Sequence, residues 1–225
     1  MLDLLSSIHI QLNNKMFLKD PESSDLGKRI IGGSIDLINE IGFDQFTFRK
    51  LSVHIGSTEA SIYRYFESKH KVLIYLNAWY WSFMEYQLAF RTTNIQDPRK
   101  RLERAICLIT EAVDEETYFQ HFNLAKVSQI VNDESLKVYL NREVDEVNKD
   151  GAFFPYKEFV SKISSIILEI NPSYRYPHML VSTAIEGAHL QRFFGKHIPR
   201  LTDVKKDKNY IYEFYKEIIF KALEP

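Results

Sequence analysis

From residue 26 onward, apolar residues recur at helical spacing, in runs separated by short breaks that contain Gly, Pro or Asn. No strand pattern competes with this periodicity after residue 25. The sequence therefore predicts an all-α chain. The predicted helices cover residues 26–41, 48–54, a short segment after Thr58, and then 69–92, 98–116, 118–131, 135–149, 156–170, 177–194 and 208–223.

Glycines punctuate the first predicted helix. Ser24 or Asp25 can cap its N-terminus, and Gly42 is suited to end it. The pair Gly32-Gly33 lies inside the helix, where each Gly costs about 1 kcal/mol relative to Ala. A neighbouring helix that passes close to this backbone would explain the pair.

The charge of the chain is unevenly distributed. A net charge of −1 excludes a protein that is basic all over, so contact with nucleic acid would require a local patch. Residues 45–75 hold five basic residues against two acidic ones, Glu59 and Glu67. The basic residues are Arg49, Lys50, Arg64, Lys69 and Lys71. A regulator with a separate DNA-reading head would have this distribution, although many ordinary proteins are also uneven in charge.

Residues 47–69 contain the signals of two short helices joined by a tight turn. Thr47 and Thr58 can cap the two helices, Gly56 permits the sharp turn, and Ser68 can cap the long helix that follows. Two short helices around a Gly, after an amphipathic helix, form a helix-turn-helix, whose second helix enters the DNA major groove. Its residues that face DNA would be Thr58, Glu59, Ala60, Ser61 and Tyr63.

The sequence resembles the TetR family of transcriptional regulators. The resemblance rests on the Thr-Phe-Arg-Lys-Leu run at 47–51, Gly56, the Ile-Tyr-Arg-Tyr-Phe run at 62–66, and Ser68-Lys69. It is strong over about residues 26–75, whereas the rest matches only in the number and length of its helices. It implies a leader at 1–24, a helix-turn-helix DNA-binding domain at 25–70, and a helical ligand-binding and dimerisation domain at 71–225.

The resemblance also assigns roles to single residues. It implies that Thr47, Tyr63 and Lys69 contact DNA phosphates, which positions a protein without reading sequence. Ser68 would present a helix N-terminus to a phosphate. The implied base-reading residues are Arg49, Thr58, Glu59, Ala60 and Ser61.

Two of these residues keep an alternative interpretation. Glu59 departs from the Lys or Arg often found at this position in the family, and it could accept a hydrogen bond from cytosine N4. It could equally be a solvated Glu in the first turn of a helix. Tyr63 lies off the stripe formed by Ile62 and Phe66, which favours phosphate contact over a place in the core.

For residues 71–225 the resemblance implies a pocket for a small apolar ligand and a dimer formed by the last two helices. Candidate lining residues are Trp79, Phe83, Phe119 and Phe122, and the alternative is an aromatic-rich core. His121 and His189 are candidate polar groups there, unless they are satisfied core histidines. Candidate dimer residues, or alternatively core residues, are Ala184, Ile185, Gly187, Ala188, Leu190, Tyr212, Tyr215, Ile219 and Leu223.

Several classes of function find no support in the sequence. A single cysteine, Cys107, excludes an intramolecular disulfide, and its apolar neighbours favour an inert core thiol. No metal-ligand spacing or catalytic set is recognisable, so we expect neither an enzyme nor a cofactor. No apolar run approaches the roughly 18 residues of a membrane span, and no signal peptide is recognisable, so a cytoplasmic location is expected.

These observations predict a ligand-responsive regulator, a repressor by family default, that binds a palindromic operator in double-stranded DNA as a homodimer. The alternative is a helical small-molecule-binding protein or an enzyme with a degenerate DNA-binding head.

Overall fold

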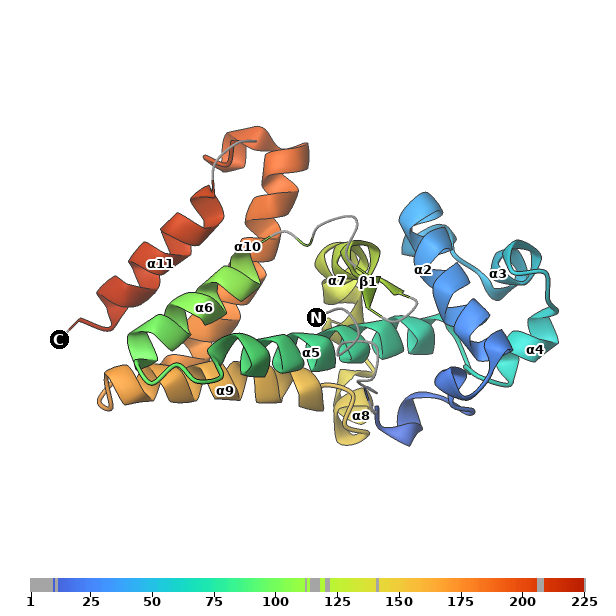
Figure 1. Ribbon diagram of the computed structural model, residues 1–225. Helices are drawn as coiled ribbons and strands as arrows, with labels where there is room; N and C mark the ends of the chain where they lie inside the picture. Colours follow the sequence, from blue (N-terminus) through green and yellow to red (C-terminus); the bar gives the residue numbers. More distant parts are fainter. Residues whose placement is uncertain are drawn as a thin grey trace. The chain divides into compact units, whose positions relative to one another are not determined.

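The computed structural model describes residues 10, 12–111, 113, 118–119, 122–140, 142–205 and 209–224, and it confirms the all-α fold (Figure 1). The N-terminal elements are η1 (Asn14–Met16), η2 (Pro21–Ser23), α2 (Asp25–Gln45), α3 (Phe48–His54), α4 (Glu59–Tyr63) and α5 (Lys69–Thr92). They are followed by α6 (Pro98–Thr110), β1 (Tyr118–Phe119), β2 (Phe122–Asn123), α7 (Leu124–Tyr139), α8 (Val144–Lys149), α9 (Phe154–Ile170), α10 (Pro177–His197), η3 (Pro199–Leu201) and α11 (Tyr210–Ala222).

The predicted helix at 118–131 is wrong at its start, where β1 and β2 form a short antiparallel hairpin instead. Tyr and Phe suit strands, and the register pairs Tyr118 with Asn123 and Phe119 with Phe122. The side chain of Asn123 then accepts a hydrogen bond from the Lys126 amide at 3.0 Å, which caps α7. This cap sets the start of α7 at Leu124. The same helix continues to Tyr139, through the break that the sequence predicts near residue 131.

One compact unit combines residues 10–80 with 113–154, as far as they are described. Here α7 packs along α2 through polar contacts at both ends. The ammonium of Lys126 pairs with Asp36 at 2.5 Å, and that of Lys137 pairs with Asp44 at 2.7 Å. Asn39 also donates a hydrogen bond to the Lys126 carbonyl. α2 is therefore fixed to α7 as well as to its neighbours in sequence.

The described part of the leader packs against this unit. Met16 is buried, and Pro21 lies so close to Gly27 that a Cβ on this Gly would overlap the Pro21 carbonyl oxygen. Asn13 donates a hydrogen bond to the Asp150 carbonyl at 2.8 Å. The segment 12–24 is thus an ordered part of the unit. Residues 1–9 and 11, also assigned to the leader, lie outside the described residues.

The other compact unit consists of residues 81–111, 155–205 and 209–224. Trp81 stacks on Tyr156 with a centroid distance of 4.2 Å and lies against Phe159, joining α5 to α9. The guanidinium of Arg192 donates to the carbonyls of Ile109 and Glu111, and so binds the C-terminal end of α6. This end falls at Thr110, six residues before the predicted one.

Cys107 lies on α6 and is partly buried. Burial, followed by the nearby Glu111 carboxylate, raises the pKa of its thiol to about 11. The thiolate is therefore scarce at neutral pH, as an inert thiol requires.

Candidate nucleic-acid interface

α2 and α3 approach each other closely at one glycine. A Cβ on Gly33 would lie 2.3 Å from Cγ2 of Ile55 and 3.2 Å from Cδ1 of Leu51. A Cβ on Gly32 would meet nothing within 4 Å. The expectation of a close neighbour therefore holds for Gly33 and not for Gly32.

The turn between α3 and α4 depends on Gly56, whose φ is +62°. Residues with a side chain rarely adopt this conformation. The Ser57 amide donates to the Ser52 carbonyl at 2.8 Å and closes the turn. Gly56 thereby permits the tight turn that joins the two short helices.

Side-chain caps begin each helix of this region where the sequence predicts. Thr47 accepts a hydrogen bond from the Lys50 amide, and Thr58 accepts one from the Ser61 amide, both at 3.2 Å. Ser68 accepts one from the Lys71 amide at 3.3 Å. These bonds satisfy amides that the first turn of a helix leaves unpaired.

α4 buries one side and exposes the other. Ile62 is fully buried together with Phe46, Leu51 and Phe66, which form the core of the head. The predicted DNA-facing residues that are exposed are Thr47, Arg49, Thr58, Glu59, Ala60, Tyr63 and Ser68, whereas Ser61 and Lys69 are partly exposed. Small residues at 60 and 61 leave the backbone of α4 accessible.

Residues 30–76 match the family model described as "Bacterial regulatory proteins, tetR family". The predicted DNA-binding domain is therefore similar to that of the TetR family, over 47 of the 225 residues. The match spans most of α2, all of α3 and α4, and the start of α5.

Solved structures share the fold over most of the chain. The superantigen PfiT superposes with a TM-score of 0.59 at 15% identity, covering 90% of this chain and 97% of its own. The fatty acid degradation regulator FadR from Bacillus halodurans gives 0.60 at 16%, with coverages of 85% and 96%. AibR in complex with isovaleryl coenzyme A and operator DNA gives 0.53 at 15%, with coverages of 86% and 97%. At these identities the similarity establishes the fold alone. No curated protein matches the chain in sequence.

In the TetR-like domain, Tyr63 fits both predicted interpretations, a place in the core and contact with a phosphate, in part. Its ring packs edge-on against Phe48 at a centroid distance of 4.9 Å, yet the side chain remains 49% exposed. The ring therefore links α4 to α3 while part of the residue stays accessible from outside.

Lys69 is already engaged by protein atoms. Its ammonium donates to the carbonyls of Phe43 and Asp44, at 2.9 and 3.0 Å, and lies 4.7 Å from the centroid of the Phe43 ring. Gly42, with φ +77° and ψ 156°, breaks the helical path just before these carbonyls. Lys69 thus ties the end of α2 to the start of α5, a contact that residue spacing alone could not reveal.

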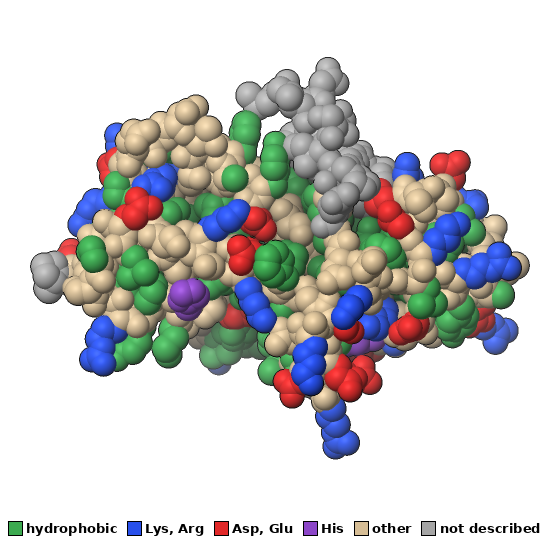
Figure 2. All heavy atoms as spheres, turned by 90° about the horizontal axis from the view of Figure 1, so that it is seen from below, with side chains coloured by type: hydrophobic (Ala, Val, Ile, Leu, Met, Phe, Trp, Pro, Cys, Tyr) green, Lys and Arg blue, Asp and Glu red, His purple; other side chains and the backbone are tan. Residues whose placement is uncertain are grey.

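The sequence reasoning left out exposed residues of α3 from the DNA-facing set. Lys50, Val53 and His54 are exposed, and Val53 is 80% exposed despite its apolar side chain. Val53 follows Arg49 by four residues and so shares its face of the helix. Its spacing of four residues from Arg49 would have identified Val53 from the sequence. Several Lys and Arg side chains project from the head in Figure 2.

Proposed function

We propose that this chain is a ligand-responsive transcriptional repressor that binds a palindromic operator as a homodimer. The observation that carries the proposal is the exposed face of α4, held by the Gly56 turn within a TetR head. Such a helix enters the major groove with its N-terminal residues toward the base edges. A cytoplasmic location is part of the proposal, because the partner is DNA.

Glu59 and Arg49 are the charged residues among the proposed base readers, and both are exposed. Glu59 and Arg49 make no ion pair among the described residues. Thr58 and Ser61 instead share a hydrogen bond of 2.8 Å between their hydroxyls, which DNA would have to accommodate. Ala60 offers close approach and van der Waals contact with a base.

Thr47, Tyr63 and Ser68 are the proposed phosphate contacts. Thr47 and Ser68 are exposed at the starts of α3 and α5, where first-turn amides lack partners within the helix. For Lys69 the two carbonyl bonds favour a second role, in which it holds the helix ends that carry these contacts.

The proposed dimer surface lies on the exposed sides of α10 and α11. Most of the expected dimer stripe is core instead: Ala184, Ile185, Ala188, Tyr215, Ile219 and Leu223 are buried by their own chain. Gly187 faces Tyr215, since a Cβ on it would lie 1.9 Å from the Tyr215 hydroxyl. The apolar side chains that remain exposed are Met179, Leu190 and Phe193 on α10, and Phe214 and Ile218 on α11.

Leu190 and Phe193 are three positions apart and Phe214 and Ile218 four, so each pair shares one face of its helix and offers apolar surface to a second copy. Beside this surface, Phe214 lines a cavity of about 380 Å³ together with Leu201 and Tyr210. A partner side chain could fill it. A symmetric dimer of this kind would place two heads on half-sites about one helical turn of DNA apart.

The proposed effector is a small apolar molecule. AibR, which shares this fold, is seen with isovaleryl coenzyme A and operator DNA. Trp79 and Phe83 are buried on α5, and the side chains of Phe119 and Phe122 lie outside the described residues. Contact of these four residues with a ligand therefore stays a prediction.

An effector regulates binding only if it prefers one conformation over the other. Within the compact unit, two helices connect a ligand-induced displacement to the helix-turn-helix. One is α5 itself, which begins at Lys69. The other is α7, which holds α2 through the Lys126–Asp36 and Lys137–Asp44 pairs. A ligand that displaces either helix would change the position of α4.

The test is selection of fragments from the source genome by the purified full-length chain, followed by gel-shift titration in increasing salt. We expect a palindromic site and a binding constant that falls steeply with salt. A chain that shows no preference among genomic fragments, including those around its own gene, would contradict the proposal and favour a helical binding protein or enzyme with a degenerate head.

A further inference from the structure

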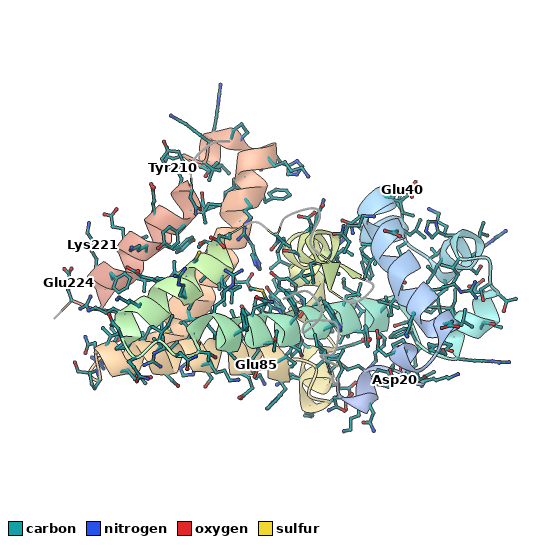
Figure 3. The ribbon with its side chains drawn as sticks, in the orientation of Figure 1. Asp20, Glu40, Glu85, Tyr210, Lys221 and Glu224 are labelled. Carbon is teal, nitrogen blue, oxygen red and sulfur yellow. The ribbon has the colours of Figure 1, made fainter. Side chains whose placement is uncertain are left out.

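The segment before α2 carries a cationic side chain to the end of α4. Leu18 donates its amide to the Tyr65 carbonyl at 2.8 Å, which fixes this segment beside the residue that follows Arg64. The ammonium of Lys19 then lies 5.0 Å from the centroid of the Tyr65 ring. Figure 3 shows the segment at the start of α2, where Asp20 is labelled.

Tyr65 is the residue that the two cations share, because Lys19 contacts its ring and Arg64 precedes it in the chain. The hydroxyls of Ser24 and Tyr65 are 2.7 Å apart. The hydrogen bond with Ser24, with Lys19 and Arg64 nearby, lowers the pKa of the Tyr65 phenol, while burial opposes this shift. Lys19 and Arg64, far apart in sequence, therefore act on one small region.

The acidic residues of the same segment are directed elsewhere. Asp20 and Glu22 line a cavity of about 280 Å³ with Phe17 and Tyr75. Burial, followed by the charges of Glu22 and Asp20, raises the pKa of Tyr75 well above its usual value. The segment thus separates its charges, with negative groups at Tyr75 and a positive group at Tyr65.

We propose that Lys19 and Arg64 form a cationic surface that binds the DNA backbone beside the half-site contacted by α4. The inference rests on the proposed DNA-binding function and extends its interface to a segment outside the helix-turn-helix. Tyr63, a proposed phosphate contact, lies on the same end of α4, so the two cations continue the surface that a sugar-phosphate strand would follow. Backbone contacts of this kind strengthen binding to every sequence alike.

Salt dependence of binding tests the proposal. The probe is a random-sequence duplex of about 30 base pairs, titrated with the full-length chain between 50 and 200 mM salt, because each phosphate contact contributes about 0.9 to the slope of log K against log salt. In Lys19→Gln and in Arg64→Gln we expect the slope to become shallower by about one per protomer. Lys19→Arg should keep the slope of the unmodified chain.

Lys15→Gln is the matched control. It removes the same charge from the same segment, but Lys15 is 60% exposed and pairs with Asp150 at 3.4 Å. We expect the slope in Lys15→Gln to stay unchanged. The melting temperature of Lys19→Gln should fall by less than about 4 °C, since Lys19 is exposed and its cation–π contact contributes little to stability.

The outcomes separate the two proposals. If the unmodified chain binds the duplex and Lys19→Gln keeps its slope, or changes it no more than Lys15→Gln does, Lys19 is a packing residue and the inference is overturned alone. If the unmodified chain does not bind the duplex at all, the proposed function fails and the inference fails with it.

Discussion

α4 and α5 follow each other in the chain but bury very different parts of their surface. Of the five residues of α4, only Ile62 is buried. In α5, by contrast, residues 72–81 are buried without interruption. A helix buried on all sides contributes to the core, whereas a helix with a single buried residue can present its other side chains to a partner. The comparison indicates that α5 contributes most to stability, whereas the proposed recognition lies in α4.

The largest expected effect is in α5. Trp79→Ala should lower the free energy of unfolding by about 3–5 kcal/mol, because it removes a large, fully buried side chain. Urea unfolding followed by circular dichroism measures the change. Phe90→Ala on the same helix is the control, because Phe90 is 55% exposed and should cost less than about 1 kcal/mol. Similar losses in the two variants would break the comparison.

A pH effect extends the comparison to α10. Burial, followed by the charge of Arg192, lowers the pKa of His189 to about 3, and its Nδ1 has no hydrogen-bond partner among the described residues. Below pH 6.5 an unfolded chain binds a proton that the folded His189 does not accept. The stability should therefore fall as the pH falls, by about 2 kcal/mol at pH 5.

His189→Gln should remove this part of the pH dependence in unfolding experiments at pH 7 and pH 5. His178→Gln changes an exposed histidine of the same helix and should retain it. Equal pH dependence in both variants would show that His189 does not carry the effect.

Gly32 and Gly33 allow a buried and an open position of one helix, α2, to be compared. Gly33→Ala should destabilise the chain by about 1 kcal/mol, because its new Cβ would overlap Ile55 and crowd Leu51. Gly32→Ala should stabilise it by up to about 1 kcal/mol, because the new Cβ meets nothing and Ala favours the helix. Thermal unfolding of the two variants gives the signs, and a shared sign would contradict the close approach of α2 and α3.

The smallest effect on stability is expected in α4. Glu59→Ala should change the free energy of unfolding by less than about 0.5 kcal/mol, because Glu59 is exposed. The same substitution should alter base preference at one position of each half-site by about 1–3 kcal/mol. Binding to a set of operators substituted at single positions measures it. An unchanged preference would make Glu59 a solvated residue of the first turn.

The short helices of the head could be predicted from sequence because their signals are local. Thr47, Thr58 and Ser68 cap helices through amides three residues away, and Gly56 determines the turn by its own conformation. Each signal acts within a few residues, so no knowledge of the tertiary fold was needed to place α3, α4 and the start of α5.

Contacts between distant residues could not be predicted in the same way. The carbonyls that Lys69 binds lie 25 and 26 residues earlier, and the segment at Lys19 packs on Tyr65, 46 positions later. The apolar stripes of α10 and α11 were visible in the sequence, but a stripe does not tell whether its partner is the same chain or another. Most of these residues proved to be core, and the exposed apolar residues beside them became the proposed dimer surface.

Binding of the full-length chain to fragments of its source genome, with and without Glu59→Ala and Arg49→Ala, tests the central claim most directly. The account predicts a palindromic site with half-sites about one helical turn apart, and changed base preference in both variants at unchanged stability. Binding without sequence preference, or variants that select the same site as the unmodified chain, would contradict the assignment of α4 and Arg49 as the DNA-reading surface.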